Sequence, residues 1–196
     1  MKKFKKDDTI MLLIDHQVGT LEWSKSKPKE MIVSRTRMLA RMAKALDIPV
    51  VLTTSMEDHA QGPLIPDLKE LLPEEYENRI KRVGITNAWA DEDYKNAVLK
   101  AAGNRKNVIM AGLTNDVCIV YPSISMVEEG FDVQVVIDAG GSPTQIADDI
   151  AQQTWEKHNV RTTTNNQLVA ELIDSWATED GQKVVSILAE EVLSKV

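Results

Sequence analysis

The sequence predicts an α/β protein in which a parallel sheet is covered by helices on both faces. Short apolar runs of strand character alternate along the whole chain with segments of helical periodicity. This alternation is typical of parallel sheets, because two consecutive parallel strands need a crossover connection that is usually a helix. No internal repeat, low-complexity stretch or linker divides the chain, so residues 1–196 are expected to form one domain.

The expected elements follow one another in a regular order. Pro28 and Pro143 each open a helix, since proline is tolerated in the first helical turn, and Asp91 caps another. The apolar runs predict strands at residues 9–15, 48–54, 78–82, 107–111, 131–138 and 160–164. Helical spacing predicts helices at residues 28–46, 91–102, 118–129, 143–157, 165–176 and 180–196, and a short apolar turn at 68–72.

The composition excludes several classes of function. A chain of 196 residues with 43% hydrophobic residues can bury a full core, and its single cysteine cannot form an internal disulfide. The net charge of −7 argues against nucleic acid as a partner, because phosphate binding needs clustered positive charge. The basic start at residues 1–6 lacks the apolar stretch and cleavage site of a signal peptide, and no segment is long enough to span a membrane. We therefore expect a cytoplasmic protein that acts on a small molecule.

Cys118 is the residue most suggestive of chemistry. It follows the strand at residues 107–111 and a polar turn, at the point where a helical pattern begins. The positive end of a helix dipole favours thiolate, so this position predicts a nucleophilic sulfur. The alternative is a buried cysteine that acts only as a small hydrophobe.

Two charged residues occupy equivalent positions after other strands. Asp15 follows the first strand and Arg82 follows the third. Ligands of open parallel sheets bind at the carboxyl ends of the strands, so Asp15, Arg82 and Cys118 are expected to meet there. The carboxylate can accept the thiol proton and the cation can hold the thiolate. Taken singly, Asp15 could instead cap a turn and Arg82 could be a surface charge beside Lys81.

These residues resemble the isochorismatase-like cysteine hydrolases, and within that superfamily the YcaC-like branch. The resemblance extends from about Thr9 to the final helix. It rests on three segments. These are Leu13-Ile-Asp15-His-Gln17 with its acidic residue, Ile80-Lys-Arg82-Val-Gly84 with the positively charged Arg82, and Gly112-Leu-Thr-Asn-Asp-Val-Cys118. Supporting stretches begin at Leu52, Gly62, Asn87 and Glu128.

The resemblance implies a three-layer α/β/α fold with a six-stranded parallel sheet and a catalytic triad of Asp15, Arg82 and Cys118. It also implies a cis peptide between Leu113 and Thr114, with the amides of Thr114 and Cys118 forming an oxyanion hole. The activity implied is hydrolysis of a small amide or related acyl compound through a thioester. Homo-oligomers, often octamers of two stacked rings, are implied as well.

The sequence departs from well-known members of the superfamily at two points. Arg82 stands where many of them have lysine; Lys81 could compete for the role, but strand alternation points it to the opposite face. Nicotinamidases hold a metal with a cluster of histidines, whereas His59 stands alone here and His16 and His158 are distant in sequence. We therefore expect no metal and no cofactor. Pro122 is acceptable only if the helix begins close to Cys118.

Substrate-binding residues and other functions stay open at this stage. The candidates for pocket walls are Gln17, Thr54, Asn87, Trp89 and Tyr121. Gln17 and Asn87 could equally make loop hydrogen bonds, and Trp89 and Tyr121 could be packing residues. The alternative function is a redox-responsive or small-molecule-binding protein that uses Cys118 as a reactive thiol. Dinucleotide binding is disfavoured, because Gly140-Gly141 is the only glycine pair and no Gly-x-Gly-x-x-Gly motif follows a strand.

The tail is expected to contribute to assembly. Val184, Ile187, Leu188 and Val192 form an apolar stripe on the helix that begins near Asp180. An apolar stripe of this kind is expected to be buried away from solvent, and a neighbouring subunit of a homo-oligomer could bury it. The alternative is that the helix packs back on its own domain.

Overall fold

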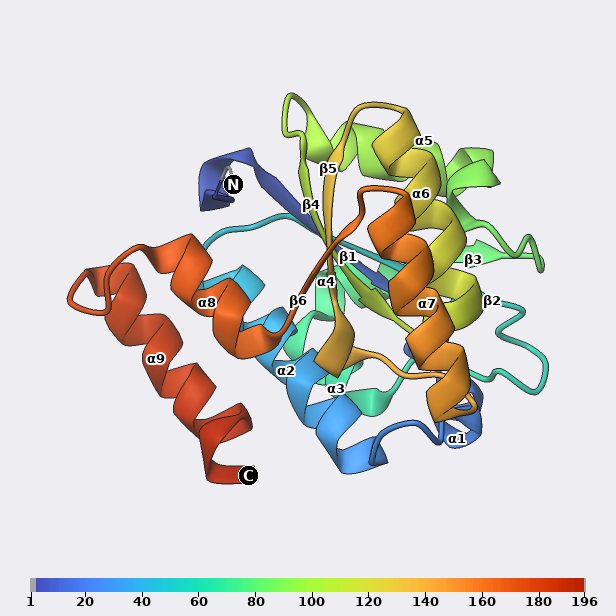
Figure 1. Ribbon diagram of the computed structural model, residues 1–196, viewed down its shortest axis with the longest axis horizontal. Coiled ribbons are helices and arrows are strands. Elements are labelled where there is room, and N and C mark those ends of the chain that lie inside the picture. The colour runs from blue at the N-terminus through green and yellow to red at the C-terminus, as the bar shows by residue number, and fades with distance from the viewer. Residues whose placement is uncertain (1–2, 196) are drawn as a thin grey trace.

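The computed structural model describes residues 3–195 and has three layers, with helices on both faces of a central sheet (Figure 1). All strand pairs are parallel, and the order in the six-stranded sheet is β3-β2-β1-β4-β5-β6. The expected fold class is therefore confirmed. The strands are β1 Thr9–Ile14, β2 Val50–Ser55, β3 Ile80–Arg82, β4 Asn107–Gly112, β5 Asp132–Val136 and β6 Arg161–Thr163.

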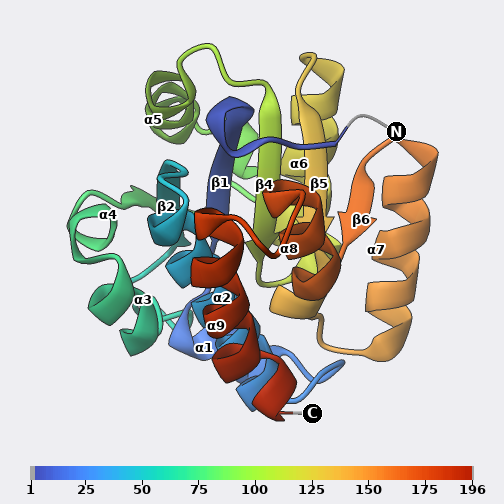
Figure 2. The ribbon, with the colours of Figure 1, turned by 90° about the vertical axis from the view of Figure 1, so that its left-hand side faces the viewer.

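Both faces of the sheet are buried. All six residues of β1 are buried, and its alternate side chains enter two different apolar clusters. Met11 and Leu13 face the cluster under α2, α8 and α9, whereas Ile10, Leu12 and Ile14 face the cluster under α5, α6 and α7. A strand covered on both sides reads as a continuous apolar run, which is why β1 was recognisable from sequence. Figure 2 shows the sheet between the two helical layers.

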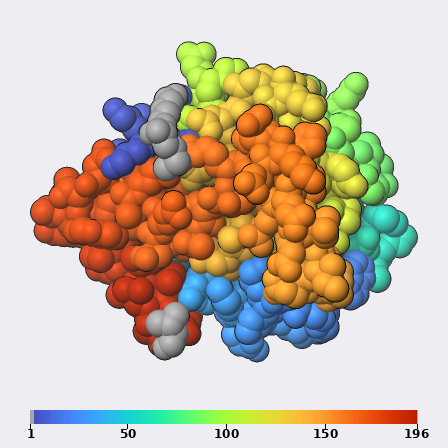
Figure 3. All heavy atoms as spheres, viewed as in Figure 1, coloured from blue at the N-terminus to red at the C-terminus, as the bar shows by residue number. Residues whose placement is uncertain are grey.

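The helices close over the sheet in the space-filling view, where α7 and the α8–α9 region form a continuous surface (Figure 3). No helix among residues 3–195 is both long enough and apolar enough to cross a membrane. The α-helices are α1 Val18–Trp23, α2 Lys29–Ala45, α3 Pro66–Leu71, α4 Pro73–Glu77, α5 Glu92–Ala102, α6 Val120–Glu128, α7 Gln145–Lys157, α8 Asn165–Ile173 and α9 Glu179–Glu191.

Several local expectations need correction. The short helix α1 was not predicted, and the region expected to hold an apolar turn contains α3 and α4, each opened by a proline at its first position. The segment carrying Cys118 is not the start of an α-helix. Asn115–Ile119 forms a wide π turn that continues into α6. Pro122 therefore lies in the first turn of α6, where a missing N–H is tolerated.

The tail helix α9 packs on its own domain. The expectation that a neighbouring subunit covers its apolar stripe is therefore wrong. Val184, Leu188 and Val192 are buried in the cluster that α2 and α8 also line. Glu191 fixes the end of α9, because its carboxylate accepts hydrogen bonds from Arg37 at 3.1 Å and Arg41 at 2.8 Å. The apolar stripe of this helix is thus covered within one chain. It gives no argument for a second subunit.

The centre of the sheet determines where a site can form. β1 lies between β2 and β4, and the chain builds the sheet outward from β1 in both directions. The carboxyl ends of β1 and β4 therefore border the point where the strand order reverses. Open parallel sheets bind ligands at that point.

Candidate active site

Asp15 follows the last residue of β1 and is fully buried. Its backbone has φ +56°, in the left-handed region that aspartate tolerates better than most residues. The Asp15 N–H donates to the carbonyl of Thr53 at 3.0 Å, and the Asp15 carbonyl accepts from Gln17 N–H at 2.7 Å. The turn is thus held on both sides, which fixes the carboxylate at the carboxyl end of the sheet.

Arg82 ends β3 and forms a buried ion pair with Asp15. Neither side chain is exposed, and Arg82 Nη2 donates to Asp15 Oδ2. Arg82 Nε also donates to Thr53 Oγ1 at 3.1 Å, and Nη1 donates to the carbonyl of Ile85 at 2.7 Å. Three acceptors in different directions hold the guanidinium plane in one orientation. Lys81, by contrast, points to the opposite face and pairs with Glu57 at 3.4 Å.

The electrostatics of this pair suit a basic carboxylate. Burial raises the pKa of Asp15, although Arg82 and the Cys118 thiol lower it. Although burial lowers the pKa of Arg82, the charge of Asp15 and its hydrogen bond help to raise the pKa above its ordinary value, so the guanidinium stays protonated. Asp15 Oδ1 has no well-formed hydrogen-bond partner among the described residues. This oxygen is available to accept a proton.

Cys118 lies in the π turn, half-buried and free. Burial and the negative charge of Asp15 raise the pKa of Cys118 to about 12, although an interaction with the Thr114 backbone amide lowers it. The sulfur is therefore a neutral thiol at rest. The expectation that the helix dipole makes Cys118 a thiolate is wrong, because desolvation and a neighbouring carboxylate outweigh the favourable backbone dipole.

The connection between β4 and the π turn places a backbone amide at the sulfur. The peptide bond between Leu113 and Thr114 is cis. Leu113 N–H donates to the carbonyl of Ile14 at 3.1 Å, which ties this connection to the end of β1. The Thr114 amide and the Asp15 carboxylate both interact with the Cys118 sulfur.

The expected pocket-wall residues have other partners. Gln17 is fully buried, its Nε2 donates to the carbonyl of Ser55 at 3.0 Å, and its Oε1 accepts from Ser55 N–H at 2.9 Å. Its side chain therefore joins α1 to the end of β2 and has no free group for a substrate. Thr54 donates to Glu57 on the face of Lys81, away from Arg82.

Asn87 and Trp89 also have partners other than the thiol. Asn87 caps a short 3₁₀ turn by accepting from Trp89 N–H, and its Nδ2 donates to Ser125 at 3.0 Å. Trp89 is 3% exposed and packs edge-to-face on Phe131 at 5.6 Å. Tyr121 follows the π turn on α6 with half its surface exposed. Asn87 and Trp89 therefore serve packing and turn geometry.

Two residues at the site were missed. Thr53 receives the Arg82 Nε–H, and strand alternation could have identified it, because Thr53 and Arg82 lie on the face opposite to Thr54 and Lys81. Tyr94 on α5 is fully buried, and its hydroxyl, unpaired among the described residues, interacts electrostatically with Arg82 and Asp15. No local sequence signal distinguishes Tyr94 from an ordinary core residue of its helix.

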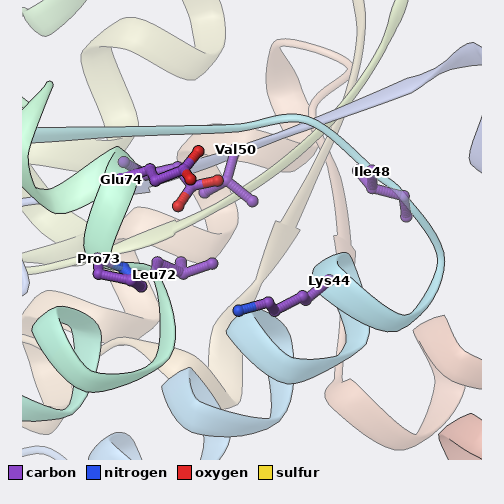
Figure 4. A pocket seen from close by; sticks show the side chains of 7 residues that line it. Lys44, Ile48, Val50, Leu72, Pro73 and Glu74 are labelled. Atoms are coloured by element: carbon purple, nitrogen blue, oxygen red, sulfur yellow. The ribbon is translucent and has the colours of Figure 1, made fainter.

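The surface cavity in Figure 4 is not this site. It lies between α2, the start of β2 and α4, and Lys44, Val50 and Glu74 are among the residues that line it. Because Val50 is the first residue of β2, the cavity is at the amino end of that strand. Asp15, Arg82 and Cys118 lie at the carboxyl ends of the strands.

Histidines give no metal centre in the described part of the chain. Residues 3–195 hold no group of three or more His, Cys, Asp or Glu side chains that could bind a metal ion. His59 and His158 are exposed. His16 is buried beside Asp15, where burial lowers its pKa to about 4 and its Nε2 lies 2.9 Å from the carbonyl of Ala139. His16 is therefore a neutral structural residue at physiological pH.

The fold and these residues define an α/β protein with a buried acid and cation and a half-buried thiol at the carboxyl ends of β1, β3 and β4. Residues 9–167 match the isochorismatase domain. The chain belongs to the isochorismatase family of hydrolases.

Three comparisons describe its place in that family. The chain is 38% identical to "Probable hydrolase YcaC" of Escherichia coli over 155 residues, which is 79% of this chain and 71% of that protein. It resembles the structure of Pseudomonas aeruginosa YcaC, solved with hexane-2,5-diol and covalent acrylamide, with TM-score 0.92, 35% identity and coverage of 98% and 93% of the two chains. The E. coli YcaC structure, an octameric hydrolase of unknown specificity, gives TM-score 0.92, 33% identity and coverage of 99% and 93%.

Proposed function

We propose that the protein is a metal-independent cysteine hydrolase that cleaves a small amide or related acyl compound, with Cys118 as nucleophile, Asp15 as general base and Arg82 as electrostatic partner. The observation that carries the proposal is the position of the Asp15 carboxylate, which binds Arg82 through one oxygen and interacts with the Cys118 thiol. A nucleophile, an adjacent base and a group that orients the base are the parts that covalent catalysis needs.

The first half of the reaction is acylation. As the Cys118 sulfur attacks the carbonyl carbon, its proton passes to Asp15, so a free thiolate is never required at the high thiol pKa of about 12. The carbonyl oxygen becomes an oxyanion. Asp15 then gives the proton to the leaving amine, the C–N bond breaks and a thioester remains on Cys118.

Hydrolysis of the thioester completes the cycle. Asp15 takes a proton from water, the resulting hydroxide attacks the thioester carbon, and the proton returns to sulfur as the acid is released. Arg82 keeps Asp15 oriented throughout and holds negative charge in the site. Because arginine stays protonated, Arg82 takes no part in proton transfer.

The oxyanion would be stabilised by backbone amides. The Thr114 backbone amide interacts with the Cys118 sulfur, which supports its assignment, with the Cys118 N–H, to the oxyanion hole. Leu113 contributes through its cis peptide to Thr114. Fixed donors of this kind are worth about 3 kcal/mol each in acyl-transfer transition states.

The relatives support a nucleophilic group and an assembly. The P. aeruginosa relative was solved with covalent acrylamide, an electrophilic alkene, which supports a reactive nucleophile in that protein. The E. coli relative is octameric, and we propose that this chain likewise forms a homo-oligomer, an octamer. Light scattering at low micromolar concentration tests the assembly, and a monomeric mass would refute it.

A redox-sensing role is not favoured. Sensor cysteines have a low pKa and often a nearby resolving cysteine, whereas the pKa of Cys118 is raised to about 12 and the chain has one cysteine. The proposed function is tested by turnover of a panel of small aliphatic and aromatic amides, with Cys118→Ser as the control. Ammonia or amine release by the wild type, absent in the folded Cys118→Ser protein, is the expected result; equal release by both would reject the proposal.

A further inference from the structure

A second buried carboxylate lies on the far side of the turn that carries Cys118. Asp148 on α7 is 1% exposed. Its Oδ1 accepts a hydrogen bond from Asn115 Nδ2 at 3.1 Å, and its Oδ2 accepts one from Lys27 Nζ. Asp148 thus connects three segments that are far apart in the sequence, and the catalytic scheme above makes no use of it.

The bond to Asn115 acts on the nucleophile segment directly. Asn115 is the first residue of the π turn Asn115–Ile119, three positions before Cys118. The same turn is held by its backbone, because Asn115 N–H donates to the carbonyl of Gly141 at 2.9 Å and Asp116 N–H donates to Ser142 Oγ at 3.3 Å. The start of the turn is therefore held by one hydrogen bond from the Asn115 side chain and two hydrogen bonds from backbone N–H groups.

Gly140 and Gly141 make this close fit possible. A Cβ on Gly140 would lie 2.5 Å from Asn115 Oδ1, and one on Gly141 would lie 2.4 Å from Ser24 Oγ. Neither position needs a positive φ, so the requirement for glycine is close approach and not backbone conformation. Gly140 therefore packs against the start of the nucleophile turn, and Gly141 packs against Ser24.

The charge of Asp148 fits a positioning role better than a stabilising one. Although burial raises the pKa of Asp148, hydrogen bonds from Lys27, Ser142 and Ser26 lower it below its ordinary value, so the carboxylate stays ionised. A buried ion pair commonly adds no more stability than apolar side chains of the same size. It does supply a strong, directional acceptor, which an apolar pair cannot.

We propose that Asp148 is a positioning residue for the nucleophile, acting through Asn115 to hold the π turn so that the Cys118 thiol stays against Asp15. Lys27 completes the arrangement by neutralising and orienting Asp148. The inference rests on the proposed function in that Cys118 is the nucleophile whose position matters.

The test uses the rate of alkylation of Cys118, the only cysteine, by iodoacetamide as a function of pH. Asp148→Ala removes the acceptor, Asp148→Asn keeps an oxygen acceptor without the charge, and Asp149→Ala changes the adjacent exposed acid as a matched control. A loosened turn moves the sulfur away from Asp15 and toward water, and both changes lower the thiol pKa. Asp148→Ala should therefore shift the alkylation midpoint down by about one pH unit or more. Asp148→Asn should recover most of the wild-type profile, and Asp149→Ala should match the wild type.

Turnover gives a second readout. Misplacing a reacting group by about 1 Å can cost roughly 10²-fold in rate, so kcat of Asp148→Ala should fall to that extent with little change in KM. If Asp148→Ala does not fold, the double variant Lys27→Met, Asp148→Leu replaces the ion pair by apolar side chains and should show the same shift.

An alkylation profile identical to the wild type in a folded Asp148→Ala or double variant would overturn the inference, even if the unfolding temperature fell. The alkylation profile needs no turnover. Failure of this inference is therefore distinct from failure of the proposed function, which would appear as amide cleavage by Cys118→Ser.

Discussion

Asp15 binds Arg82 through Oδ2 and leaves Oδ1 without a well-formed hydrogen bond among residues 3–195. Neither side chain of this ion pair is exposed. One oxygen thus fixes the carboxylate, and the other remains basic beside the Cys118 thiol. This division of roles within one carboxylate leads to two predictions about the thiol.

Asp15→Asn should lower the pKa of Cys118 while it abolishes turnover. Burial makes the largest contribution to the pKa of Cys118 of about 12, and the negative charge of Asp15 and its bond to the thiol raise the pKa further, so removing that charge stabilises the thiolate. Alkylation by iodoacetamide at pH 8 should become faster than in the wild type, although amide cleavage is lost with the base. Slower alkylation together with retained turnover would contradict this account.

Arg82→Ala should have the opposite effect on the thiol and a large cost in stability. Without the guanidinium the thiolate loses a stabilising charge, so the pKa of Cys118 should rise and alkylation should slow. Asp15 would also be left buried and unpaired, at a cost of about 3–5 kcal/mol of unfolding free energy. Urea denaturation measures that loss.

Lys81→Ala is the matched control for Arg82→Ala. Lys81 is the adjacent cation, lies on the opposite face of β3 and pairs with Glu57. Its loss should leave the alkylation rate unchanged and should alter the unfolding free energy by less than about 1 kcal/mol. A slower alkylation in Lys81→Ala would mean that the wrong cation has been assigned.

Stability at acid pH should depend on Glu57. Hydrogen bonds from Arg79, then from Thr54, lower the pKa of Glu57 from 4.5 to about 2, and its side chain is 10% exposed. Because the folded pKa is below the unfolded one, the stabilisation is complete above pH 5 and is lost as the pH falls toward 2. The unfolding free energy should fall by about 3 kcal/mol over this pH range. Glu57→Gln should remove this part of the pH dependence of urea unfolding; an unchanged slope between pH 5 and 2 would be evidence against it.

Activity should survive removal of metal ions. The site has one thiol, one carboxylate and one guanidinium, and no cluster of ligands lies among the described residues. Turnover after prolonged dialysis against EDTA should therefore equal that of the untreated protein. A loss that zinc or manganese restores would contradict the metal-independent scheme.

The fold could be predicted because buried parallel strands and amphipathic helices leave strong patterns, as the unbroken apolar run of β1 illustrates. The three charged or nucleophilic residues could be placed at the strand ends for the same reason. The pKa of Cys118 could not, because it depends on burial and on the distance to Asp15 in space. The π turn was missed because its five residues carry no helical periodicity of their own.

The contacts of the candidate pocket residues could not be predicted from the sequence, for a more local reason. Thr53 and Thr54 look alike in the sequence, and only the register with Ile80 and Lys81 shows which of them shares a face with Arg82. Gln17 is a polar residue two positions after Asp15, but its side-chain amide binds the backbone of Ser55. The tail helix was read as an interface because its stripe is apolar, whereas α2 and α8 cover it.

The central claim is that Cys118 carries the acyl group. The most direct measurement is the mass of the intact protein, followed by peptide mapping, after rapid acid quench during turnover of an amide identified in the panel. The account predicts a population heavier by the mass of the acyl group, with the adduct on the peptide that contains Cys118 and absent from Cys118→Ser. Turnover with no adduct at any quench time, and with undiminished rate in Cys118→Ser, would contradict it.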